Sequence, residues 1–209
     1  MEDILDLYHE SYNPERPVVC FDESSKQLIS EKRVPMPILP GKVTRYDYEY
    51  TREGVRNIFM FCEPLTGQRH VEVTQRRTKA DWADCMQQLV DELYPDATCI
   101  RVVMDNLNTH NPAALYEFFE TQQAKRLLDH LEFHYTPKHG SWLNIAEIEF
   151  SALARQCINR RIPDEATLKQ EIAAWEARRN AQNAKVDWQF TTKAARIKLK
   201  KLYPSLHDC

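Results

Sequence analysis

The stretch from His134 to Phe150 reads HYTPKHGSWLNIAEIEF and joins an apolar run to a helical pattern through a turn that holds a proline and a glycine. Its first residues are typical of a buried strand, and from Asn144 onward the apolar residues have helical spacing. Glu147 would lie in the first turn of that helix, near the positive end of the helix dipole. A carboxylate in this position can face a site rather than bulk water.

Two aspartates elsewhere in the chain each follow a short apolar run. Val18–Phe21 precedes Asp22, and Cys99–Met104 precedes Asp105. A short apolar run with turn-forming residues on either side is typical of a buried strand. We therefore expect both carboxylates at the ends of strands, with residues 26–45, which contain three prolines and a glycine, forming a loop.

The order of the predicted elements indicates the fold class. An antiparallel meander followed by alternating helices and strands implies a mixed sheet flanked by helices. This is the order of a ribonuclease H-like α/β fold with five strands. The strands are predicted at 18–21, 55–62, 69–74, 99–104 and 131–135, with a further extended segment at 46–50, and the helices at 79–94, 112–128, 144–159 and from 163 onward.

The length of 209 residues suits one main domain with an appendage. We expect an N-terminal helix and linker at 1–16, a catalytic domain at 17–162 and a basic helical extension at 163–209. From residue 176 to 201 the chain has eight Lys or Arg and two acidic residues. This tail is either a solvated helical face or a phosphate-binding surface.

The composition argues against several classes of protein, among them membrane-spanning, secreted and disulfide-rich proteins. No apolar run approaches the ~18 residues of a membrane span, and the acidic start lacks the features of a signal peptide, so we expect a cytoplasmic protein without a membrane partner. The six cysteines are scattered and form no C-x-x-C pair, which argues against a zinc site or a disulfide framework. The net charge of −3 does not by itself indicate a nucleic-acid binder.

Asp22, Asp105 and Glu147 would meet if the first and fourth strands are parallel neighbours at the centre of the sheet, because sites in such sheets lie at the carboxyl ends of the strands. Crowded carboxylates repel one another unless cations neutralise them. Oxygen ligands without His or Cys favour Mg²⁺ or Mn²⁺. Two such ions can promote in-line phosphoryl displacement. From the residues alone this is a weak signal, because capping and turn roles explain most acids at the ends of helices and strands.

Three motifs carry a family resemblance. FDES at 21–24, MDNLNTH at 104–110 and LNIAE at 143–147 resemble, in the same order, the acidic motifs of DDE transposases. The third motif is similar to the Leu-Asn-x-x-Glu of the bacterial insertion-sequence branch related to mariner elements. The resemblance runs from about residue 17 to beyond 161. It implies that Asp22, Asp105 and Glu147 are the catalytic, metal-binding triad.

The resemblance further implies cleavage of DNA at transposon ends and joining of the 3′-OH to target DNA. We expect a homodimer assembled on DNA, with two metal ions in each site and nucleoid association when bound. Other residues could bind DNA or support the triad, although turn and structural roles are open for them too. They are Asn106, His110, Lys138, His139, Ser141 and Asn144.

Chains of this family usually carry DNA-recognition helices upstream of the catalytic domain. Only 21 residues precede Asp22 here, too few for a helix-turn-helix unit. Recognition is then encoded separately, or the chain is a catalytic fragment or a silent DNA-binding remnant. A non-transposing nuclease of the same fold, which cuts RNA–DNA hybrids or branched DNA, is the remaining alternative.

Overall fold

The computed structural model describes residues 1–33, 40–41, 47–138 and 140–203. Its centre is a five-stranded mixed sheet in the order β3-β2-β1-β4-β5. β1 pairs antiparallel with β2 and parallel with β4, as predicted for the two central strands. β2–β3 is antiparallel and β4–β5 parallel, so the ribonuclease H-like α/β class is confirmed. The strands are β1 Val18–Glu31, β2 Tyr50–Glu63, β3 Gln68–Thr74, β4 Ile100–Met104 and β5 Leu131–Tyr135.

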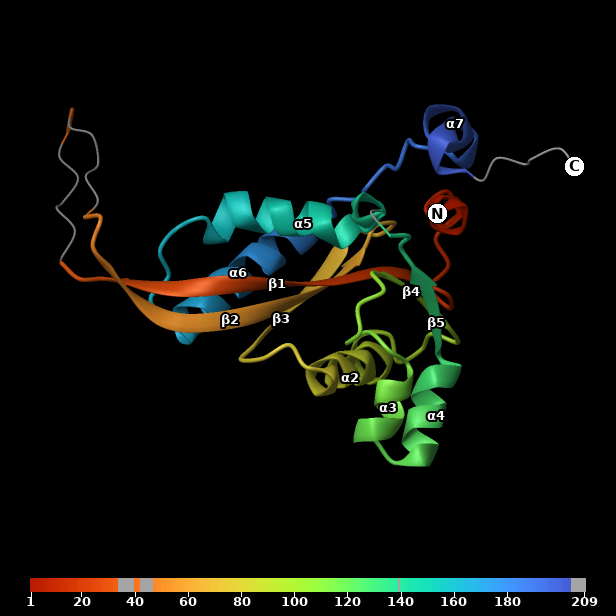
Figure 1. Ribbon diagram of the computed structural model, residues 1–209, viewed down its shortest axis with the longest axis horizontal. Coiled ribbons are helices and arrows are strands. Elements are labelled where there is room, and N and C mark those ends of the chain that lie inside the picture. Colours follow the sequence, from red (N-terminus) through yellow and green to blue (C-terminus); the bar gives the residue numbers. More distant parts are fainter. Residues whose placement is uncertain (34–39, 42–46, 139, 204–209) are drawn as a thin grey trace, which may run out of the picture.

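Helices cover both faces of the sheet (Figure 1). α2, α3 and α4 pack on one face, where Phe21, Phe59 and Trp82 are buried together. α5 and α6 lie on the other face, above the β1–β2–β3 half of the sheet. The helices are α1 Glu2–Leu7, α2 Lys79–Gln88, α3 Ala113–Phe118, α4 Thr121–Asp129, α5 Ile145–Leu153, α6 Glu165–Ala181 and α7 Thr192–Lys198, with π-turns η1 Leu89–Leu93 and η3 Ala154–Ile158 and 3₁₀ turns η2 Ser141–Leu143 and η4 Lys200–Leu202.

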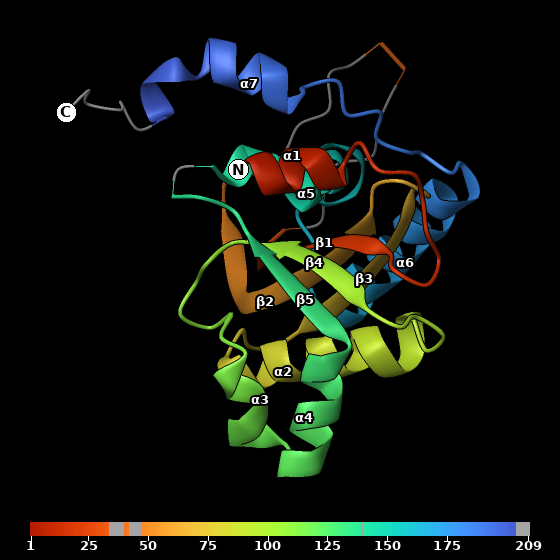
Figure 2. The same cartoon turned by 90° about the vertical axis from the view of Figure 1, so that its right-hand side faces the viewer.

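The two ends of the chain meet beside α5. α1 and α7 lie next to each other on the side of the sheet that carries α5 (Figure 2). Ile4 and Leu5 of α1 share an apolar cluster with Ile145 of α5 and Ala195 of α7. Arg196 pairs with Glu2 at 2.7 Å across this contact. The first turn of α5 is therefore held from the sheet below and from both terminal segments.

The first strand is longer than the prediction. β1 continues to Glu31, so the expected loop over 26–45 is wrong for its first six residues. The strand continues because residues 24–31 pair with β2, which begins at Tyr50 opposite Glu31. Of the extended segment predicted at 46–50, Tyr46 lies outside the described residues and Tyr48 forms a bend.

The helix predicted over 112–128 is two helices. Phe119 has an extended backbone (φ −120°, ψ 155°), which ends α3, and α4 begins at Thr121 after Glu120. The apolar spacing continues through both helices, and for this reason the break is not visible in the periodicity. Thr78 and Asp81 form a capping box at the start of α2. The described cysteines, from Cys20 to Cys157, are all free thiols.

A buried ion-pair network ties α5 to the sheet and to α6. Glu149, 2% exposed, accepts from Arg69 Nε at 2.6 Å and from Arg179 Nη2 at 2.9 Å. Arg69 also donates to the backbone oxygen of Ala184 at 2.7 Å. Burial would raise the pKa of Glu149, but the two arginines outweigh it and lower that pKa. β3, α5, α6 and the segment after α6 are thus joined at one carboxylate.

Replacement of Glu149 by alanine leaves buried arginine charges without a partner, so we expect the free energy of unfolding to fall by about 3–5 kcal/mol. The matched control is Glu171→Ala, since its ion pair with Arg160 is exposed and contributes at most about 1 kcal/mol. Urea unfolding followed by circular dichroism measures both losses. Equal losses in the two variants would contradict a central role for the network.

The same network predicts a pH dependence. Because the pKa of Glu149 is lower in the folded chain than its ordinary value of 4.5, its contribution is complete above that value and is lost as pH falls through the folded pKa. The stability difference between wild type and Glu149→Ala is therefore expected to be constant between pH 6 and 8 and to shrink below about pH 4.5. Urea unfolding across that range checks the sign.

Candidate functional site

Strand register places Asp22 and Asp105 side by side. Cys20 pairs with Val103 in the parallel β1–β4 ladder, and each aspartate lies two residues further along its strand direction. β1 continues past this point along β2, where Asp22 faces Met60. Asp22 is therefore inside a long strand rather than at its end, but it does lie just beyond the last β1–β4 pair. Both residues are half-buried.

The alternation of side chains along β1 and β4 shows which face of the sheet each position belongs to. Cys20 and Val103 belong to the apolar cluster under α5, whereas Phe21 and Met104 belong to the core under α2. Successive side chains of a strand point to opposite faces of the sheet. Asp22 and Asp105, two residues after Cys20 and Val103, therefore lie at positions on the face that α5 covers. That is the helix that carries Glu147.

Asn144 fixes the start of α5 against β1. Its Nδ2 donates to the backbone oxygen of Phe21 at 2.8 Å, next to Asp22, and its Oδ1 accepts from the backbone N–H of Ala146 at 3.1 Å. Asn144 is 1% exposed, so this predicted supporting residue is a buried anchor and helix cap with no surface for DNA. Glu147 lies in the first turn that follows, and its side chain is exposed.

The carboxyl group of Asp22 lies within electrostatic range of the other two predicted acids. Burial raises the pKa of Asp22 to about 7, against the effect of a hydrogen bond from the backbone N–H of Glu23 at 2.8 Å. The negative charges of Asp105, Glu23 and Glu147 raise that pKa further. The structure thus brings the three predicted acids into one negatively charged region that favours cations.

In the described part of the chain, no three His, Cys, Asp or Glu side chains are clustered tightly enough to form a ready-made ion site. The donor set is nevertheless suited to a hard divalent cation, because it consists of carboxylate oxygens. Because burial and the neighbouring acids raise the pKa of Asp22 to about 7, a cation bound there would compete with a proton for this carboxyl group. The three acids therefore fit a divalent ion by donor chemistry and by charge.

His110 lies under this region and is not exposed to solvent. Its Nε2 is 2.8 Å from Glu23 Oε2, and its Nδ1 is 2.6 Å from Asp105 Oδ1 and 3.1 Å from the Asp105 backbone oxygen. Burial alone would lower the pKa of His110, but Asp105 and Glu23 outweigh it and raise that pKa to about 10. A charged His110 then holds Asp105 in place from below. It is 2% exposed and cannot contact DNA directly.

Glu23 is the residue of this site that sequence reasoning missed. It is next to Asp22 in FDES, and strand alternation turns it toward the α2 face, where Phe21 and Trp82 flank His110. A carboxylate on a core-facing strand position requires a partner. That requirement was a usable signal, although the partner, 87 residues away, could not be identified from spacing.

The other predicted residues lie on or near the surface. Asn106 follows β4 and is exposed, as are Lys138 and Ser141 between β5 and α5. His139 lies outside the described residues. Trp142, 39% exposed, stacks on Trp188 with ring centroids 6.3 Å apart, so it covers the segment that follows α6.

The basic tail is only partly available for phosphates. Arg179 pairs with Glu149, and Arg196 pairs with Glu2. Lys193, Lys198 and Lys200 are exposed. In the tail, some basic side chains therefore form ion pairs within the chain, and the exposed lysines are open to solvent. Among the described residues, no helix has the length and apolar content that a membrane crossing requires.

Comparison with solved structures finds the same fold in Mos1 transposase, a mariner element. The structure described as the Mos1 paired-end complex with left transposon end matches with a TM-score of 0.59 and 14% identity over 87% of this chain. The Mos1 strand transfer complex matches with a TM-score of 0.58 and 15% identity over 95% of this chain. This chain spans about half of those proteins, 55% and 56%. A comparison with curated protein sequences found no match.

The family assignment comes from the sequence itself. A family model described as DDE superfamily endonuclease matches residues 17–169, which cover β1 to the first residues of α6 and include Asp22, Asp105 and Glu147. The match extends over well more than half of the chain. The chain therefore belongs to the DDE superfamily endonucleases.

Proposed function

We propose that this chain is the catalytic domain of a transposase, which cleaves DNA at transposon ends and joins the freed 3′-OH to target DNA. The observation that carries the proposal is the shared site of Asp22, Asp105 and Glu147 on β1, after β4 and on α5. Burial raises the pKa of Asp22 to about 7, and the negative charges of Asp105 and Glu147 contribute to this rise. Family membership and the fold shared with Mos1 transposase support it.

The three acids would hold divalent metal ions, and two ions are the number that such chemistry uses. Bound Mg²⁺ or Mn²⁺ supplies activation of the attacking oxygen and stabilisation of the leaving oxygen in a phosphodiester displacement. Two of the Mos1 complexes of the same fold are described as structures with Mn and with Mg. The likeness supports the same metal class here.

The chain's own groups position the reaction. Asn144 holds α5 against β1, so that Glu147 stays beside Asp22. His110 orients Asp105 through its ion pair. The attacking group in both cleavage and joining is an oxygen of water or of DNA, so the chain needs no Ser or Cys nucleophile. Exposed Asn106, Lys138 and Ser141 flank the site, where they can donate hydrogen bonds to phosphates.

DNA is the proposed partner, with two transposon ends held by a homodimer, which would place the protein at the nucleoid. The solved relatives are described as paired-end and strand transfer complexes. Recognition of a specific end sequence is proposed to need a further DNA-recognition domain. The exposed lysines of the tail would add salt-dependent affinity without sequence preference.

The first test is nicking of supercoiled plasmid DNA with Mn²⁺ or Mg²⁺. Asp22→Asn, Asp105→Asn and Glu147→Gln each remove one charged metal ligand, and we expect each to lower the rate by about 10²–10³-fold or more. Asp129→Asn, an exposed change of the same kind on α4, is expected to leave the rate unchanged. Nicking by Asp105→Asn at the Asp129→Asn rate would sink the assignment.

The second arm of that test separates transposition from other nuclease activity. Wild-type protein is offered linear DNA, branched DNA and an RNA–DNA hybrid, each with a labelled 3′-OH strand. Joining of the labelled strand to plasmid DNA supports the transposase. Cleavage of the hybrid or branched substrate without any joining favours the non-transposing nuclease.

His110 gives a further prediction. Because it holds Asp105 from below, His110→Gln is expected to weaken Mn²⁺ binding by about 10–100-fold, the effect of losing a residue that orients a metal ligand. Isothermal titration with Mn²⁺ measures the affinity, and thermal unfolding without metal shows whether the fold is retained. His130→Gln, on the far end of α4, is the control. Unchanged Mn²⁺ affinity in a folded His110→Gln protein contradicts the positioning role.

A further inference from the structure

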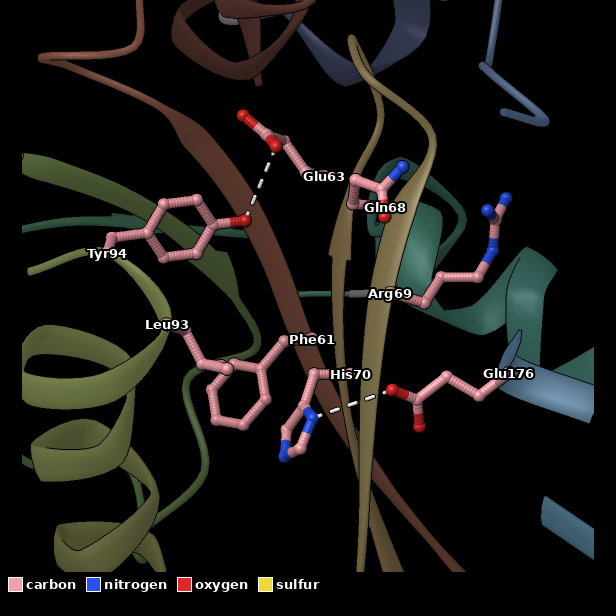
Figure 3. Close-up of a pocket in the computed structure, with 8 residues that line it drawn as sticks. All are labelled: Phe61, Glu63, Gln68, Arg69, His70, Leu93, Tyr94 and Glu176. Carbon is pink, nitrogen blue, oxygen red and sulfur yellow. Dashed lines mark hydrogen bonds and ion pairs between the residues drawn. The ribbon is translucent and has the colours of Figure 1, made fainter. Parts of the chain in front are cut away.

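A cavity of about 350 Å³ lies at the end of the β2–β3 hairpin (Figure 3). Phe61 and Glu63 of β2, His70 of β3, Tyr94 after η1 and Glu176 of α6 line it. None of the three proposed catalytic acids is among its lining residues. Its size is within the range of small-molecule pockets, roughly 300–1,000 Å³.

Glu63 is the residue in this cavity that lacks a counter-charge. It is 3% exposed. Its Oε2 accepts from Thr66 Oγ1 at 2.6 Å and from Tyr94 Oη at 3.4 Å, whereas its buried Oε1 has no hydrogen-bond partner. In the described ranges, no Lys, Arg or His lies within ion-pair distance of it. Burial of an unpaired carboxylate is costly, and it raises the pKa of Glu63.

The surroundings of Glu63 suit a cation with a carbon body. Phe61 lies across from His70 in the β2–β3 register, their rings 6.1 Å apart, and Tyr94 borders the opposite side beside Glu63. Aromatic faces attract cations, most strongly where water is excluded. Glu176 adds a second carboxylate, 3.6 Å from His70 Nδ1. Arg69 also lines the cavity, but its guanidinium is paired with Glu149, so it does not balance the charge of Glu63.

Two backbone elements border the cavity, the π-turn η1 on one side and the edge of β3 on the other. The π-turn η1 widens the end of α2 and sets Leu93 and Tyr94 at the rim. Side chains of α6 occupy the outer edge of β3, where Glu176 accepts from the backbone N–H of Val71 at 3.1 Å and Asn180 exchanges hydrogen bonds with the backbone of Arg69. This edge cannot extend the sheet with another strand. The cavity is therefore a pocket for a compact group and not for an added strand.

We propose that this cavity binds an organic cation, an amidinium, guanidinium or primary ammonium group, whose positive charge pairs with the carboxylate of Glu63 while its carbon body contacts Phe61 and Tyr94. The same charged group occurs in free amines and in Lys or Arg side chains of a partner protein. The inference is independent of the proposed DNA chemistry, since it uses none of the catalytic acids.

The test compares two ligands of the same shape on the wild-type chain. Acetamidinium carries the charge and acetamide does not. We expect acetamidinium to bind with a dissociation constant on the order of 1–10 mM, at least tenfold more tightly than acetamide. Titration followed by NMR shifts of the His70 and Tyr94 rings measures both. Equal binding of the two ligands, or no binding of either, overturns the proposal.

Variants then locate the contact. Glu63→Gln keeps the shape of the side chain and removes its charge, so the preference for acetamidinium is expected to fall at least tenfold. Glu92→Gln, an exposed carboxylate on η1, is the matched control and keeps the preference. If Glu63→Gln does not fold, the two-ligand comparison on wild type still decides. Retained preference in a folded Glu63→Gln protein contradicts the proposal.

A final arm distinguishes the sources of the cation. Spermidine represents a free amine, and N-acetyl-arginine amide represents a side chain of a partner. Tighter binding of spermidine assigns the cavity to free amines, and tighter binding of the capped arginine assigns it to a protein partner. Asp105→Asn is expected to bind acetamidinium as wild type does, because that residue is not part of this cavity.

Discussion

Two hydrogen bonds from Asn144 hold the arrangement on which the candidate site depends. One joins the start of α5 to the backbone of Phe21 in β1, and the other caps the helix itself. α5 therefore cannot slide along the sheet without breaking a buried polar contact, which is expensive in a region that excludes water. Tyr8 secures the same point from the other side, since its hydroxyl donates to the backbone oxygen of Leu143 at 2.7 Å. The position of Glu147 follows from these contacts and not from its own side chain.

The carboxylates that are buried or half-buried in this chain differ in how their negative charge is balanced. This difference separates carboxylates that stabilise the fold from those for which we propose a binding role. Glu149 has two arginines, and Glu23 has His110, so their charges are balanced within the chain. Asp22 has other acids as neighbours, and Glu63 lacks a basic partner among the described residues. A charge that the chain balances itself supports the fold. A charge that it leaves to an outside cation is where we propose binding, of divalent metal at Asp22 and of an organic cation at Glu63.

Sequence patterns predicted most of the sheet because its central strands are continuous apolar runs and its helices have clear periodicity. The parallel neighbourhood of Asp22 and Asp105 could be predicted for this reason. The length of β1 could not, because residues 24–31 are mostly polar and become a strand only through pairing with β2. The partners of Glu149 and Glu23 could not be predicted either, since Arg69 and His110 are 80 and 87 residues distant along the chain and only the folded topology brings them together.

The two glutamates of α5 show how spacing on one helix divides roles that sequence alone leaves open. Residues two positions apart on an α-helix point about 200° away from each other. Since Asn144 sets which side of α5 faces the sheet, Glu149 turns into the interior toward Arg69, and Glu147 turns outward toward the open edge beside Asp22. Glu149 is then committed to two arginines and has no freedom to approach the aspartates. Glu147 keeps an exposed carboxylate within electrostatic range of Asp22, and for this reason we propose it, rather than Glu149, as the third metal ligand.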